Sequence, residues 1–186
     1  MNKLRYLIEK RLAEKQKINK ARNNLLWLFL LSSFIFFTFL SILYTQIKAK
    51  NFQLTPIFYL STFMVLVNSI SIHVSYVYYK KDELEKGLLY LYFTLAICFM
   101  FLCLQLVGWS QLFVRYYEVL KSNLMLFIII SGFHFAHIVG GWLFLIYLVF
   151  AHHRYKIHAK SINGIKNATF YFHTLGIVWL ILFILF

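Results

Sequence analysis

Acidic residues are few in this sequence, and none of them lies in the middle of a long apolar run. The 186 residues include six Asp and Glu against 19 Lys and Arg. Proton pumps and ion-coupled carriers usually depend on intramembrane carboxylates or charge pairs. The intramembrane serines and threonines also lack a nearby carboxylate that could orient a histidine base. We therefore expect neither transport nor catalysis by this chain alone.

Cysteine and proline are scarce as well. The two cysteines, Cys98 and Cys103, lie on one apolar run, and at this spacing they point about 140° apart on a helix, so they cannot pair with each other. The sequence contains no Cys-x-x-Cys motif and no cluster of carboxylates with histidines, and we predict no metal site. The one proline, Pro56, suits the first turn of a helix.

Apolar residues are abundant and are gathered into long runs. They make up 61% of the sequence, against roughly 45–50% in an average soluble protein, and the mean hydropathy is +0.71. Five of the runs are long enough to cross a bilayer as helices. We therefore predict an all-α integral membrane bundle that forms a single domain over residues 25–186. The predicted spans are 25–44, 56–79, 88–109, 123–151 and 168–186.

Basic residues flank the predicted spans and indicate their orientation. With the N-terminus inside, fifteen Lys and Arg lie on the inner side and four on the outer side, which is the bias expected of cytoplasmic segments. We predict that the N-terminus is inside and the C-terminus outside. The net charge of +13 then favours anionic lipid head groups as partners, and no nucleic acid. Residues 1–24 are either a basic amphipathic helix on the membrane surface or a solvated tail.

The fourth span carries the most informative segment, residues 131–142, because two different faces follow from its spacing. The first face is formed by Gly132, Ala136 and Gly140. The neighbouring face is formed by His134, His137 and Gly141. The first has the small-xxx-small spacing that lets two membrane helices approach closely. The second places two imidazoles at membrane depth, where we expect them to face other helices and not lipid.

Polar side chains in the other spans are expected to hydrogen-bond between helices. In the second span, Asn68 and Ser71 fall on one stripe with Ser61 and Ser75, and such stripes usually bond to a neighbouring helix. Further candidates within or at the ends of the spans are Gln105, His173 and Trp179.

Four histidines lie inside the predicted spans: His73, His134, His137 and His173. Two of them could ligate a b-type haem if they faced each other across the bundle at one depth. Hydrogen bonding between helices is the other interpretation, because buried polar groups are usually satisfied by a partner. Both interpretations stay open at this point.

Two histidine blocks resemble a known family. Residues 132–141, Gly-Phe-His-Phe-Ala-His-Ile-Val-Gly-Gly, resemble the Gly-Phe-His-x-x-His-x-x-Gly-Gly segment of subunit III of haem–copper oxidases. Residues 171–180, Tyr-Phe-His-Thr-Leu-Gly-Ile-Val-Trp-Leu, are similar to that family's closing Tyr-Trp-His-x-x-Asp-x-x-Trp-Leu helix. Residues 60–62 resemble its Leu-Asn-Thr block, and Gln105 with Trp109 resembles its Gln-x-x-Glu-aromatic pattern. The blocks keep the family's order and spacing over residues 25–186, as in the five-helix bacterial form of the subunit.

The resemblance implies an accessory subunit that has no catalytic residue and no cofactor of its own. In that family the subunit packs beside the catalytic subunit I, which holds haem and copper, in a complex that also contains subunit II. It binds phospholipid between its helices and supports sustained turnover. The implied complex is a terminal oxidase of a bacterial plasma membrane that reduces oxygen with electrons from cytochrome c or quinol. We expect packing, interface or lipid-binding roles for Gly132, Ala136, Gly140, Gly141, His134, His137, His173, Trp179, Asn68, Ser71 and Gln105.

The sequence departs from the resembling family at three acidic positions. Ser33, Gly108 and Gly176 stand where the family has carboxylates, which indicates a divergent or second subunit III-like protein. Two other functions remain open. One is an accessory subunit of a nitric oxide reductase, with the same fold and a different catalytic partner. The other is a small b-type membrane cytochrome that uses the intramembrane histidines.

Overall fold

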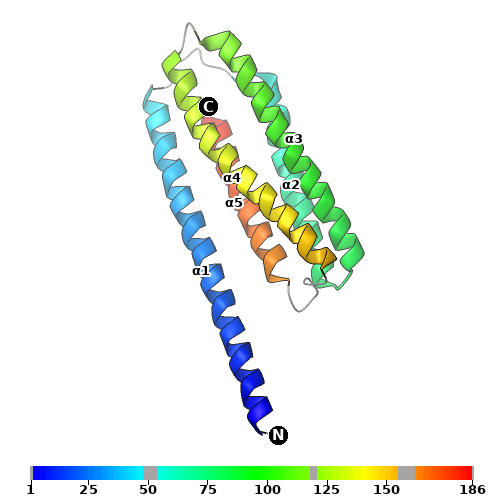
Figure 1. Ribbon diagram of the computed structural model, residues 1–186. Coiled ribbons are helices and arrows are strands. Elements are labelled where there is room, and N and C mark those ends of the chain that lie inside the picture. Colours follow the sequence, from blue (N-terminus) through cyan, green and yellow to red (C-terminus); the bar gives the residue numbers. More distant parts are fainter. Residues whose placement is uncertain (1, 48–53, 118–120, 155–161, 186) are drawn as a thin grey trace. The chain divides into compact units, whose positions relative to one another are not determined.

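The described part of the chain is helical apart from its short turns. The computed structural model (Figure 1) describes residues 2–47, 54–117, 121–154 and 162–185. Its helices are α1 (Asn2–Ile47), α2 (Pro56–Lys80), α3 (Leu84–Tyr116), α4 (Lys121–His153) and α5 (Asn163–Leu185). These ranges contain no β-strand, and all five helices are long and apolar enough to cross a membrane. The prediction of an all-α bundle with five membrane-spanning helices is therefore confirmed.

The chain divides into two compact units, Met1–Phe36 and Phe37–Phe186, and α1 runs through the boundary between them. The first unit contains eight of the 19 Lys and Arg, and residues 5–11 are all exposed. Helix α1 continues without a break from this basic stretch into the first apolar run. The basic stretch and the apolar run are therefore one helix and not two elements.

The helices extend beyond the apolar spans that hydropathy marks. Helix α3 begins at Leu84 and ends at Tyr116, although the predicted span covers only 88–109, and α5 begins at Asn163, ahead of the predicted 168. Backbone hydrogen bonds continue through polar residues as well as apolar ones. Hydropathy therefore marks the part of a helix that suits lipid, and it does not mark where the helix ends.

A tight turn joins α2 to α3. Asp82 in this turn has a φ of 62°, in the left-handed region that aspartate tolerates better than most residues. The Lys86 ammonium donates a hydrogen bond of 2.6 Å to the Glu83 carboxylate, and this bond lowers the pKa of Glu83. The turn makes α2 and α3 antiparallel neighbours, and they form the most extensive helix pair in the structure.

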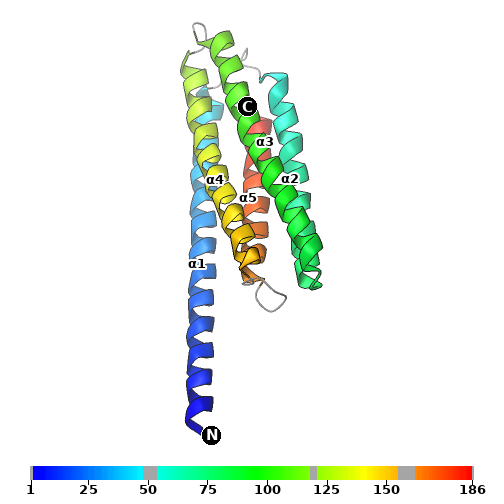
Figure 2. The same cartoon turned by 45° about the vertical axis from the view of Figure 1, so that its right-hand side comes forward.

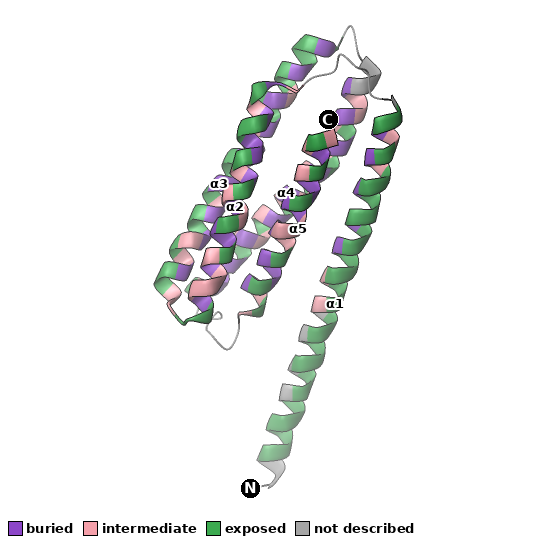
Figure 3. Cartoon of the chain, turned by 180° about the vertical axis from the view of Figure 1, so that it is seen from behind, coloured by how far each residue is buried: buried purple, intermediate pink, exposed green. Residues whose placement is uncertain are grey.

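Helices α2–α5 pack around an interior rich in aromatic side chains. Helix α2 contacts both α3 and α5, and α4 contacts the same two helices, as Figures 1 and 2 show. Buried residues recur along all four helices in Figure 3. The largest fully buried side chains on these helices include Trp179, Tyr79, Phe58 and Phe127. This packing brings the polar residues of different spans into contact.

Candidate functional site

His134 lies in the interior of the bundle, in a cage of aromatic rings. Its side chain is 1% exposed. Trp179 stacks on the imidazole with ring centroids 5.2 Å apart, and Phe37 and Phe101 meet it edge-on at 5.9 and 6.4 Å. Neither ring nitrogen has a hydrogen-bond partner in the described structure. Such a buried, unpaired polar group costs stability, so its presence needs an explanation other than packing alone.

Two hydrogen bonds beside His134 join α2 to α3 and α5. The indole Nε1 of Trp179 donates to Oγ1 of Thr62 at 3.0 Å. Nε2 of Gln105 donates to Oγ of Ser61 at 3.2 Å. All four side chains are buried. Gln105 and Trp179, which the sequence patterns singled out, are therefore both fixed to the second helix.

The hydroxyl groups farther along α2 bond to α3. Oγ of Ser71 lies 2.8 Å from Oγ1 of Thr94 and donates to the carbonyl oxygen of Tyr90 at 3.2 Å. Ser75 donates to the carbonyl oxygen of Gly87 at 2.7 Å. The polar stripe of α2 thus faces its antiparallel neighbour. Asn68 differs from the rest of the stripe, because its Oδ1 is buried and has no partner in the described structure.

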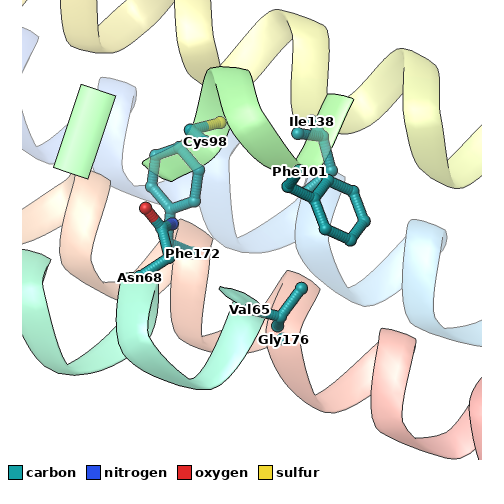
Figure 4. A pocket seen from close by; sticks show the side chains of 7 residues that line it. All are labelled: Val65, Asn68, Cys98, Phe101, Ile138, Phe172 and Gly176. Atoms are coloured by element: carbon teal, nitrogen blue, oxygen red, sulfur yellow. The ribbon is translucent and has the colours of Figure 1, made fainter. Parts of the chain in front are cut away.

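A small cavity lies beside Asn68 (Figure 4). Its volume is about 10 Å³, which is near the lower limit for one water molecule. It is lined by Val65, Asn68, Cys98, Phe101, Ile138, Phe172 and Gly176. A Cβ atom placed on Gly176 would lie 3.4 Å from Cγ1 of Val65. The space beside Asn68 is thus bordered by Gly176, one of the three positions where the resemblance in the sequence implies a carboxylate of the family.

The other two positions where the resemblance implies carboxylates of the family are Gly108 and Ser33, and their surroundings differ. A Cβ atom placed on Gly108 would lie 2.7 Å from Cζ of Phe58 and 2.9 Å from Cγ2 of Ile57. The second helix therefore already fills the space that an acidic side chain would need there. Ser33 lies on α1, in the first compact unit.

Gly141 marks a close approach of α4 and α5. A Cβ atom placed on it would lie 2.7 Å from Cε1 of Tyr171 and 2.9 Å from Cζ of Phe172. One turn away, the Tyr171 hydroxyl donates to the carbonyl oxygen of His137 at 2.7 Å. The His137 ring bonds through Nδ1 to the carbonyl oxygen of Phe133, 2.7 Å away on its own helix. These contacts hold the two histidine-bearing helices together.

Gly132, Ala136 and Gly140 form a face of α4 that makes little contact within the described chain. Ala136 and Gly140 are exposed, and Gly132 is half-buried. Among the described residues beyond the local helix backbone, a Cβ atom placed on Gly132 would have no atom within 4 Å, and one on Gly140 would meet the Tyr171 hydroxyl oxygen alone, at 3.9 Å. We call these three residues the small face. Its lack of side-chain bulk leaves room for a helix of another molecule.

The structure also brings His73 and His173 together, on α2 and α5. Their ring centroids are 5.7 Å apart with the planes tilted by 47°, and the Ser69 hydroxyl hydrogen-bonds to Nδ1 of His173. His134 and His137 lie on α4, where both rings contact Phe37. Among the described residues no group of three or more His, Cys, Asp and Glu side chains is placed to hold a metal ion.

Several interhelical contacts involve residues to which the sequence analysis assigned no packing contact. Nε1 of Trp142 donates to the carbonyl oxygen of Leu95 at 3.2 Å, and Nε1 of Trp109 donates to Oγ of Ser131 at 3.0 Å. Thr62 and Tyr171 were missed in the same way. Residue type alone could have indicated the contacts of the Trp and Tyr residues, because Trp and Tyr usually find a hydrogen-bond partner when they are buried.

Comparison with known proteins gives one consistent result. The sequence model of the cytochrome c oxidase subunit III family matches residues 18–186. The chain belongs to the cytochrome c oxidase subunit III family. The predicted resemblance is therefore confirmed, and the five apolar helices are those of a member of a membrane-protein family.

Individual subunit III relatives are distant and longer. Cytochrome c oxidase subunit 3 of Allomyces macrogynus is 28% identical over 126 residues, which are 67% of this chain and 45% of the relative. The protein of the same name from Locusta migratoria is 26% identical over 126 residues, 67% of this chain and 47% of the relative. That of Petromyzon marinus is 36% identical over 58 residues, 31% of this chain and 22% of the relative. The chain thus spans less than half the length of these subunit III relatives.

Replacing His134 tests whether this member of the subunit III family keeps a buried imidazole at a cost in stability. His134→Phe should leave the thermal unfolding midpoint in detergent unchanged or raise it. A phenyl ring fits among Phe37, Phe101 and Trp179, and it removes two unpaired polar atoms that cost about 1–3 kcal/mol each. His134→Ala should lower the midpoint, because it leaves a cavity. A clear loss of stability in His134→Phe would mean that the imidazole has a partner.

Proposed function

We propose that the chain is a non-catalytic accessory subunit of an aerobic respiratory terminal oxidase. It packs on the catalytic subunit I, in a complex that also holds subunit II, and it supports assembly and turnover. Haem and copper belong to those partner subunits, and this chain contributes no redox centre. Its family membership over residues 18–186 supports the proposal, as does the uncovered small face of α4.

The small face is suited to contact with a partner helix. Ala136 and Gly140 are exposed, whereas the same side of α4 carries the large exposed side chains of Leu143, Tyr147 and Phe150 nearer the other end. A helix of another subunit can approach the backbone closely at the small end and rest on the larger side chains beyond it. In lipid, close van der Waals packing of this kind drives helix association.

The proposed setting is the plasma membrane of a bacterium, with the N-terminus in the cytoplasm and the C-terminus outside. The excess of Lys and Arg on one side of the spans supports this orientation. Helices α2 and α3 are joined by a turn with charged residues, where Lys86 and Glu83 form an exposed salt bridge, and this turn then lies on the cytoplasmic side. Phospholipid bound between the helices is part of the proposed role.

Enlarging the small face should weaken the complex while leaving the chain folded. In Ala136→Leu and Gly140→Leu, the added side chains point at the partner, so we expect less haem to co-purify with the tagged chain in mild detergent. Ala96→Leu is the matched control, since Ala96 is an exposed alanine on α3. Thermal unfolding of each purified chain shows whether folding is affected. Equal haem content in all variants would contradict a partner contact at this face.

A further inference from the structure

A second and larger cavity lies between α2 and α5. Its volume is about 250 Å³. The residues that line it are His73, Tyr76, Lys166, Thr169, Phe170 and His173. Of these, His73, Lys166 and Phe170 are exposed, so the cavity is open at the outer surface of α2 and α5. We call it the basic pocket.

Both histidines of the basic pocket lie at membrane depth. His73 comes seven residues before the end of α2, roughly 10 Å along the helix, and His173 comes ten residues after the start of α5. Ionisable side chains at this depth almost always face the interior of a bundle or pair with a partner. His73 is nevertheless exposed on the outer surface of the described chain. An imidazole in this position is poorly suited to lipid tails, which indicates that another protein helix covers it.

The lining of the basic pocket is cationic and contains hydrogen-bond donors. None of the six lining residues is acidic, and Lys166 forms no salt bridge with any residue that the structure describes. When the Ser69 hydroxyl donates to Nδ1 of His173, Nε2 of that ring carries the proton and becomes a donor. A cation beside such donors suits a carboxylate, because hydrogen bonds to a charged acceptor are the strong ones.

The size of the basic pocket and the surface beside it favour a side chain carried by a helix. Small-molecule sites begin at roughly 300 Å³, and this pocket is a little smaller, which leaves room for a single side chain. A stripe of exposed apolar residues on α2 leads to His73, at alternating spacings of four and three residues. These residues are Tyr59, Phe63, Leu66 and Ile70. The same spacing is the repeat along which two helices pack side by side.

We propose that the basic pocket receives a carboxylate of a partner subunit, carried by a membrane helix that packs along the exposed stripe of α2. Lys166 supplies the opposite charge, and His73 and His173 donate hydrogen bonds to the carboxylate oxygens. A carboxylate in the membrane is costly without such partners, so this contact fixes the depth of the partner helix. The inference rests on the proposed function in requiring a partner subunit, and it adds a second contact surface to the small face of α4.

Photocrosslinking from inside the pocket identifies what occupies it. The photoreactive amino acid p-benzoylphenylalanine replaces Phe170 in the tagged chain, and cell membranes are irradiated. We expect an adduct with a partner-subunit peptide that has Asp or Glu within about one helical turn of the attachment point. The same replacement at Phe93, an exposed phenylalanine on α3, is the matched control and should not give this adduct. Lipid adducts alone or no adduct at position 170, or the same peptide from position 93, would overturn the proposal.

Charge variants test the ion pair itself. Lys166→Gln should lower the haem that co-purifies with the tagged chain about fivefold, because the partner's carboxylate loses its opposite charge, whereas Lys166→Arg should keep the haem. Lys81→Gln is the matched control, because it removes one exposed charge from the α2–α3 turn, outside the pocket. Reversing both charges, with Lys166→Glu and a lysine at the crosslinked acidic position, should restore the haem. Equal haem in Lys166→Gln and Lys81→Gln would contradict the ion pair.

The wild-type chain separates a failure of this inference from a failure of the proposed function. A wild-type sample without haem and without subunit I would count against the proposed function. A wild-type sample with haem would leave the proposed function intact. If Lys166→Gln then lost a bound lipid by native mass spectrometry and kept its haem, the occupant would be a lipid phosphate, and the carboxylate site would be wrong.

Discussion

Gly141→Leu is expected to separate α4 from α5 and to destabilise the chain strongly. Any Cβ atom at this position would lie 2.7 Å from Cε1 of Tyr171 and 2.9 Å from Cζ of Phe172, and leucine adds three more carbons beyond it. Overpacking of this kind costs about 3 kcal/mol or more when neither neighbour can move away. Movement of Tyr171 would also break its hydrogen bond to the carbonyl oxygen of His137. Thermal unfolding in detergent should show a midpoint well below that of the wild type.

Gly132→Leu is the control for this substitution, because it makes the same chemical change on the same helix. Beyond the backbone of its own helix, no atom of the described residues lies within 4 Å of a Cβ atom placed on Gly132, so the isolated chain should unfold near the wild-type midpoint. The same variant should still interfere with the partner, since Gly132 belongs to the small face. If Gly132→Leu and Gly141→Leu destabilised the isolated chain equally, the assignment of the two faces of α4 would be wrong.

Trp179→Ala should cost about 3–5 kcal/mol of unfolding free energy, the range for a fully buried tryptophan. The side chain is 1% exposed, and it connects α5 to three other helices. Its ring stacks on His134 and meets Phe101 edge-on at 5.4 Å, and its Nε1 bonds to Thr62. The loss of this ring should be measured by chemical or thermal unfolding in detergent.

A graded series separates packing from hydrogen bonding at this position. Trp179→Phe keeps a ring against His134 but removes the donor to Thr62, so its cost should be intermediate. Ile177→Ala, on the exposed side of the same helix, should have a small effect. A Trp179→Ala variant as stable as Ile177→Ala would show that α5 does not pack through this residue.

The number and approximate place of the helices could be predicted because five apolar runs exceed the length needed to cross a bilayer. The spacing of the polar residues on α2 also predicted that they hydrogen-bond to a neighbouring helix. In the structure, Ser71 and Ser75 bond to α3. The residues at which the helices end were harder to predict from the sequence. Hydropathy carries no signal for helical turns that continue past the apolar run, as at both ends of α3.

The spacing of residues along one helix did not predict which other helix each face contacts. Small residues at helical spacing show that a close approach is possible, but not which helix makes it. In the structure Gly141 contacts Tyr171 and Phe172, while Ala136 and Gly140 stay exposed. The pairing of His134 with Trp179 and the joining of His73, Lys166 and His173 in one pocket depend on how α2, α4 and α5 pack, which no local pattern encodes.

The central claim is that this chain is a subunit III that works within an oxidase complex. Affinity purification of the tagged chain in mild detergent tests it most directly, with a visible spectrum and mass spectrometry of the same sample. The account predicts haem bands together with a large, histidine-rich subunit I and a copper-binding subunit II. Haem bands with this chain alone, or a colourless sample with unrelated partners, would contradict it.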